Sequence, residues 1–92
     1  MLITILAIVV TALPYFNHSP GRFELRVRAN GYVGAMCLTV DGPEFHRSCW
    51  TRLVKDPEVR ITHLTLHAVG EYTMMIDDKA GNHRVGTIAV VE

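Results

Sequence analysis

Residues 64–91 read LTLHAVGEYTMMIDDKAGNHRVGTIAVV, and this stretch decides the fold. Two runs within it, 72–77 and 85–91, alternate side chains in a period of two and are rich in β-branched, aromatic and other apolar residues. Such alternation is typical of strands that bury one face. Residues 77–82 between them are Asp, Asp, Lys, Ala, Gly and Asn, and Asp, Gly and Asn favour turns. The stretch therefore predicts a hairpin of two long strands joined by a polar loop.

A third strand precedes this hairpin at residues 64–68. Its apolar side chains, Leu64, Leu66 and Ala68, share one face, and the strand turns at Gly70. Together the three strands predict either an antiparallel meander or the corner of a β-sandwich.

The middle of the chain continues the pattern of strands. Residues 22–28 alternate apolar and charged side chains, as expected of a strand with one buried and one solvated face. The Asn-Gly pair at 30–31 predicts a tight turn into the next strand, at 32–40. A later change in the phase of the apolar residues predicts a bulge near 62–63, where the strand would cross between sheets.

The two cysteines allow a geometric inference. Residues 41–44 read as a turn, and a hairpin centred near Pro43 places Cys37 directly opposite Cys49. Opposite residues of an antiparallel pair have β-carbons about 4.5 to 5.5 Å apart, which suits a disulfide. We therefore predict a Cys37–Cys49 bond, with two free, buried cysteines as the alternative. On the same register Trp50 falls in a core cluster.

A resemblance to immunoglobulin-like domains rests on two segments of the decisive stretch. Gly-Glu-Tyr-Thr at 70–73 and Lys-Ala-Gly-Asn at 79–82 resemble the end of intermediate-set domains and of bacterial Ig-like modules. The resemblance implies a small, divergent Ig-like antiparallel β-sandwich of six or seven strands. It also implies that Tyr72 packs at a corner between two strands, with its hydroxyl bound to nearby backbone.

The same resemblance implies roles for residues of the predicted core. Trp50 would correspond to the family's strand C tryptophan and Cys37 to its strand B cysteine. Met74 stands where the family has its second cysteine, two residues after Tyr72. We therefore expect Trp50, Tyr72 and Met74 in the structural core.

The N-terminal residues differ in composition from the rest. Residues 1–16, MLITILAIVVTALPYF, form a continuous apolar run, and no charged residue precedes Arg22. The run is shorter than the roughly twenty residues of a membrane-spanning helix and has the length of a signal-peptide core, while its Ile and Val residues also suit a buried strand. A removed signal, a retained membrane anchor and a buried strand all stay open. The chain then divides into a leader or anchor with its linker at 1–21 and an Ig-like domain at 22–92.

Composition argues against several functions. Nine Lys and Arg residues balance nine Asp and Glu residues, without the basic face expected of nucleic-acid binding. The sequence contains no nucleophile elbow and no phosphate-binding glycine loop, so we expect neither an enzyme nor a cofactor. His63 and His67 on one strand face are weak candidates for metal ligands, because two histidines need further ligands. We interpret them mainly as surface residues.

These features predict a non-catalytic structural or interaction module. A small accessory subunit at a membrane or cell surface would bind a neighbouring protein through a sheet face or an edge strand. The alternatives are a virion or filament subunit with a buried N-terminal arm, and a secreted ligand- or metal-binding domain. The leader and the disulfide predict a periplasmic, cell-surface or secreted location, with a membrane anchor through residues 1–16 or a place in a virion as alternatives.

Overall fold

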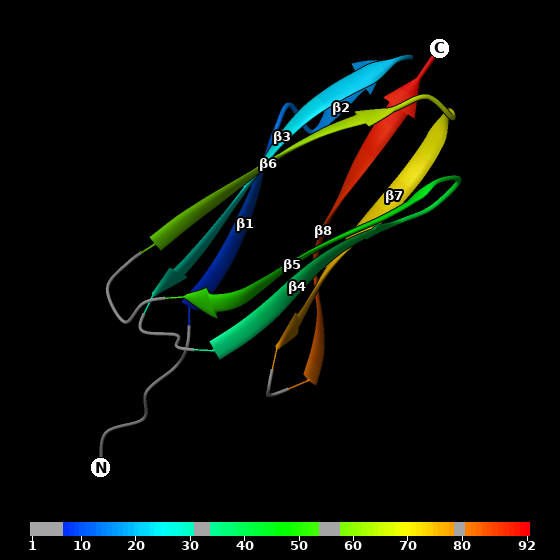
Figure 1. The fold of residues 1–92 in the computed structure, drawn as a ribbon. Helices are drawn as coiled ribbons and strands as arrows, with labels where there is room; N and C mark the ends of the chain where they lie inside the picture. Colours follow the sequence, from blue (N-terminus) through cyan, green and yellow to red (C-terminus); the bar gives the residue numbers. More distant parts are fainter. Residues whose placement is uncertain (1–6, 31–33, 54–57, 79–80) are drawn as a thin grey trace.

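The computed structural model describes residues 7–30, 34–53, 58–78 and 81–92, which form eight β-strands in two sheets (Figure 1). The three-stranded sheet has the order β1 (Ala7–Leu13), β3 (Gly21–Asn30), β6 (Glu58–Leu66). The five-stranded sheet has the order β2 (Phe16–His18), β8 (Gly81–Val91), β7 (Gly70–Asp78), β4 (Gly34–Asp41), β5 (Phe45–Leu53). The predicted all-β class is confirmed.

The hydrophobic core lies between the two sheets, because alternate side chains of each strand point inward. The buried apolar residues are Ala12, Phe23, Leu25, Val27, Met36, Leu38, Val40, Leu66, Tyr72, Met74, Ile76, Ile88 and Val90. Tyr72 and Met74, which we expected in the core, are 0% and 1% exposed. Trp50 is half-buried and packs against the cluster from β5.

The decisive stretch forms the predicted hairpin and a corner. β7 and β8 pair antiparallel along their length, with one register shift between Met74 and Met75. The strands extend to Asp78 and from Gly81, so the connection is shorter than the predicted loop. β6 belongs to the other sheet, so the chain turns a sandwich corner at this point and does not continue as a meander.

Two predictions about the middle of the chain are wrong. β3 and β4 lie in different sheets, so the Asn-Gly pair does not join them as a hairpin; residues 31–33 themselves lie outside the described residues. β6 is continuous, pairs with β3 without a register shift and stays in one sheet. The apolar phase changes because Val59 and Ile61 point outward, where they are 49% and 53% exposed.

The N-terminal part contributes two strands to the sandwich. β1 pairs antiparallel with β3, and β2 pairs parallel with β8, so the chain passes from one sheet to the other between them. Both strands precede residue 22, where we expected the domain to begin. Within the described ranges no helix is both long and apolar enough for a transmembrane span. The interpretations as a removed signal or a membrane anchor stay predictions.

Candidate functional site

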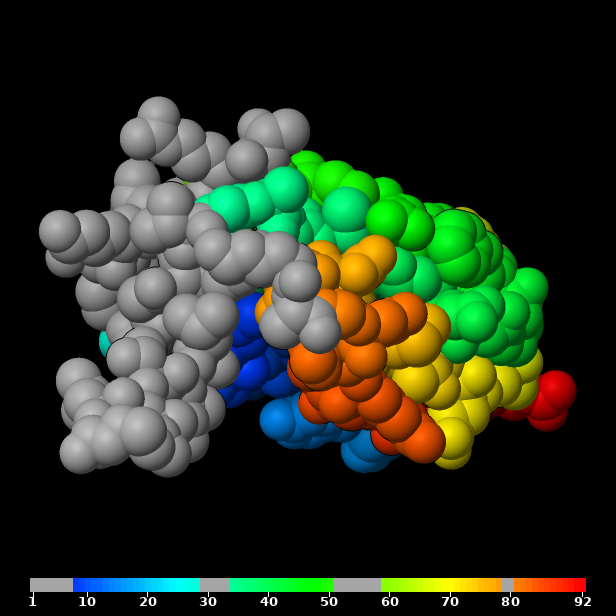
Figure 2. Space-filling model, turned by 90° about the horizontal axis from the view of Figure 1, so that it is seen from below, coloured from blue at the N-terminus to red at the C-terminus, as the bar shows by residue number. Residues whose placement is uncertain are grey.

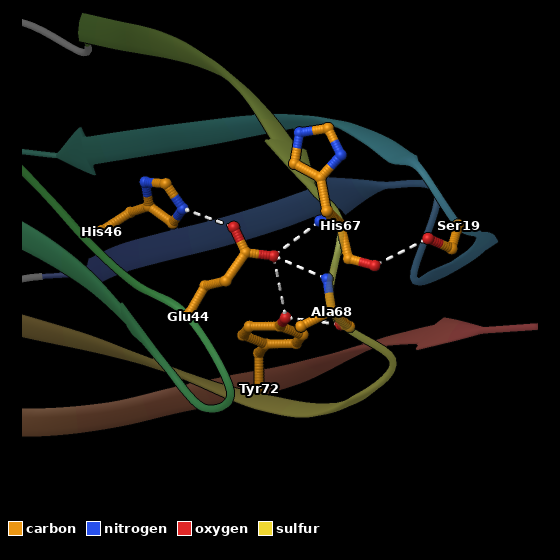
Figure 3. Close-up of polar contacts among 6 residues, drawn as sticks. All are labelled: Ser19, Glu44, His46, His67, Ala68 and Tyr72. Carbon is orange, nitrogen blue, oxygen red and sulfur yellow. Dashed lines mark hydrogen bonds and ion pairs between the residues drawn. The ribbon is translucent and has the colours of Figure 1, made fainter.

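Glu44 is the polar centre of one end of the sandwich, and the turn between β4 and β5 places it there. Gly42 in this turn allows a close approach, because a Cβ atom at that position would lie 2.7 Å from the Glu71 carbonyl oxygen and 2.7 Å from a ring carbon of Tyr72. The turn therefore packs on the start of β7, and the Glu44 side chain reaches the corner between β6 and β7 (Figure 3).

The Glu44 carboxylate binds the backbone of this corner. Its Oε2 atom accepts hydrogen bonds from the backbone N–H groups of His67, at 2.6 Å, and Ala68, at 2.7 Å. The Tyr72 hydroxyl donates to the Ala68 carbonyl oxygen at 2.6 Å and lies 3.4 Å from the same Oε2. The Ser19 hydroxyl donates to the His67 carbonyl at 2.6 Å. We call Ser19, Glu44, His46, His67, Ala68 and Tyr72 the corner cluster (Figure 3).

The protonation states of the corner cluster follow from these contacts. The Ala68 N–H lowers the pKa of Glu44 below its ordinary value of 4.5, and the His67 N–H and His46 act in the same direction against partial burial. Burial raises the pKa of the Tyr72 hydroxyl, and the charge of Glu44 raises it further. Glu44 is therefore a carboxylate and Tyr72 a neutral phenol at neutral pH. A carboxylate that accepts two backbone hydrogen bonds is stabilised in its charged form and holds the corner together.

We expect Glu44→Gln to lower stability at neutral pH and to flatten its dependence on acid pH. The folded pKa of Glu44 lies below its unfolded value, so its stabilisation is complete above about pH 4.5 and is lost as the pH falls through the folded pKa. Urea unfolding of both proteins between pH 7 and pH 3 measures the difference. If the difference in free energy of unfolding between the two proteins did not decrease in acid, this role of the Glu44 charge would be contradicted.

The histidines are distributed over different strands and loops, and the Nε2 atom of His46 is buried. The rings of His46, His63 and His83 lie 3.6, 3.3 and 3.2 Å from the carboxylates of Glu44, Glu24 and Asp78. His63 on β6 and His67, directly after the end of β6, are both exposed. Within the described residues, no group of three or more metal-ligating side chains comes together.

The predicted disulfide is confirmed. Cys37 on β4 and Cys49 on β5 are register partners, with Cα atoms 4.0 Å apart and sulfurs bonded at 2.10 Å. The role implied for Cys37 as a strand B cysteine does not hold, because the bond links neighbouring strands of one sheet on its outer face. Trp50 lies on β5, which is next to β4 at one edge of this sheet.

Sequence reasoning anticipated the corner at Tyr72 but missed Glu44. The bond from the Tyr72 hydroxyl to Ala68 spans four residues, so the local motif indicates it. Glu44 lies 23 and 24 residues from its backbone donors. Nothing in a Pro-Glu turn signals such a distant contact.

Comparison with protein families and with curated proteins gives no match from which a function could be inferred. No model of a protein family matches the chain, and no curated protein matches it. The corner cluster joins the β4–β5 turn to the corner between β6 and β7.

Proposed function

We propose that the protein is a non-catalytic, immunoglobulin-like module that binds a neighbouring protein through the outer face of its three-stranded sheet. The partner surface carries carboxylates among apolar side chains. The single observation that carries this proposal is a row of arginines on β3 flanked on both sides by exposed apolar side chains. We call this surface the arginine face.

The arginine face is built by the register of the three strands. Val9 on β1 and Val59 on β6 flank Arg28, and Ile61 lies beside Arg26. Val9, Val59 and Ile61 are 53%, 49% and 53% exposed. Leu13 flanks Glu24 at the far end of the face, beside a hollow of about 350 Å³ that Arg22 also lines.

Charge and chemistry indicate the kind of partner. Arg22, Arg26 and Arg28 are exposed on this face, with Glu24 as the one carboxylate of the same row of β3. Arg26 pairs with Glu24 at 2.6 Å, whereas the structure gives Arg22 and Arg28 no ion pair within the described residues. Grouped exposed apolar side chains mark interaction surfaces, and arginine is enriched in protein interfaces. The excess positive charge favours an acidic partner.

Two features support the immunoglobulin-like assignment, and a third bears on the compartment. The N-terminal part switches sheets between β1 and β2, and β2 runs parallel to β8. The Tyr72 hydroxyl binds the backbone four residues upstream at the start of β7, as in a tyrosine corner. The Cys37–Cys49 bond suits an oxidising, extracytoplasmic compartment, although it does not link the two sheets.

A photoreactive amino acid at position 61, introduced in the cells that make the protein, tests the arginine face. We expect one discrete adduct with an acidic protein. In an Arg28→Glu background the adduct yield should fall by about tenfold or more, because a charge central to the contact is reversed. Intact-mass analysis and peptide sequencing of the adduct measure the result.

Arg84→Glu provides the matched control. Arg84 is also exposed but lies on β8, in the other sheet, so its reversal should leave the adduct yield unchanged. Equal losses in the two backgrounds, or an adduct between two copies of this chain, would contradict the proposal. An adduct between two copies would instead favour the filament alternative.

A further inference from the structure

The Cys37–Cys49 bond lies outside the core. Cys49 is exposed and Cys37 is half-buried, and neither belongs to the buried cluster between the sheets. β4 and β5 share six further register pairs, and β4 also pairs with β7 on its other side. The two strands therefore stay neighbours without the disulfide.

The two sulfurs have different surroundings. β5 is the last strand of its sheet in the described part of the chain, so no strand lies beyond Cys49 on the side away from Cys37. On its far side Cys37 faces Asp77 of β7, its register partner. Figure 2 shows the β4 and β5 segments in green beside the yellow and orange segments of β7 and β8.

Charged side chains lie next to Cys37. Arg47 of β5 pairs with Asp77 of β7 at 3.6 Å, so this ion pair spans the intervening strand β4 next to Cys37. A hollow of about 310 Å³ beside Cys37 is lined by Asp77 and Asp78. At Cys37 an approaching thiolate therefore meets strand β7 and the Asp77 carboxylate of this ion pair, whereas Cys49 is exposed at the sheet edge.

From this asymmetry we propose that the disulfide is a site of thiol–disulfide exchange at which an external dithiol attacks Cys49. The attacking thiolate approaches the attacked sulfur from the side opposite the bond that breaks, which for Cys49 is the open sheet edge. A bond forms between the reductant sulfur and Cys49, and Cys37 leaves as a thiolate that takes a proton from water. The second thiol of the reductant then attacks the mixed disulfide, releases Cys49 and leaves the reductant oxidised by two electrons.

Because the cysteines lie outside the core and six further register pairs hold β4 and β5 together, the exchange needs no unfolding. The native protein should therefore be reduced by dithiothreitol within about tenfold of the rate measured in denaturant, as expected of an exposed disulfide. The reduced protein should keep the dispersed amide spectrum of the oxidised form. Reduction only at the rate of global unfolding, or a reduced protein that is unfolded, would overturn the proposal.

The attacked sulfur is identified with glutathione. After brief exposure of the native protein to glutathione and rapid alkylation, peptide mass spectrometry should find glutathione on Cys49 and the alkyl group on Cys37. Asp77→Asn removes the carboxylate of the register partner of Cys37 and should increase the minor fraction of adduct on Cys37. A wild-type adduct mainly on Cys37 would overturn the assignment of Cys49, and the result is independent of any binding by the arginine face.

Discussion

Tyr72→Ala will lower the free energy of unfolding by about 3–5 kcal/mol, the range for truncation of a large buried aromatic side chain. Tyr72 is fully buried in the core and its hydroxyl also holds the corner through Ala68. A domain of this size is stable by only about 5–10 kcal/mol. The variant should therefore lose at least about a third of its stability in urea unfolding.

Tyr72→Phe separates the two contributions of this side chain. It keeps the ring in the core and removes only the hydrogen bond to the Ala68 carbonyl, so we expect a loss of about 1 kcal/mol. Tyr15→Ala is the control, since Tyr15 is 60% exposed and its change should stay within about 0.5 kcal/mol. A neutral Tyr72→Phe would contradict the hydrogen-bonded corner.

The features that could be predicted from the sequence are those set by neighbouring residues. The period of two in residues 85–91 and the turn residues before them determine the β7–β8 pair. The register of β4 and β5 follows from the turn around Pro43, and it places Cys37 opposite Cys49. The position of the turn and the alternation of apolar and polar side chains leave little freedom in the register of two strands that are close in sequence.

The features that could not be predicted depend on which surfaces meet across the molecule. β3 and β4 each have an apolar face, and the same pattern suits a hairpin pair or two strands facing each other across a core. Exposed apolar residues are common, so the sequence alone does not distinguish the outward direction of Val59 and Ile61 from a change of sheet. The contact of Glu44 with the β6–β7 corner joins residues that only the folded chain brings together.

The second large effect concerns Ala12, because it tests whether residues 7–13 form part of the sandwich. Ala12 is 0% exposed and faces Leu25 of β3 across the strand pair. Ala12→Glu places a carboxyl group in the core, where burial opposes its ionisation, and should cost about 3 kcal/mol or more at neutral pH. Urea unfolding of the purified full chain measures this loss.

Two comparisons make the result specific. Val9→Glu introduces the same group on the same strand, but Val9 is 53% exposed and lies opposite Arg28, so its effect should stay within about 0.5 kcal/mol. Burial raises the pKa of the carboxyl introduced by Ala12→Glu. The loss of unfolding free energy in this variant, relative to Val9→Glu, should therefore decrease as the pH falls and the group becomes neutral. Equal stability of the two variants at neutral pH would mean that residues 7–13 do not pack as β1. That result would favour the interpretation of the N-terminal run as a leader or anchor.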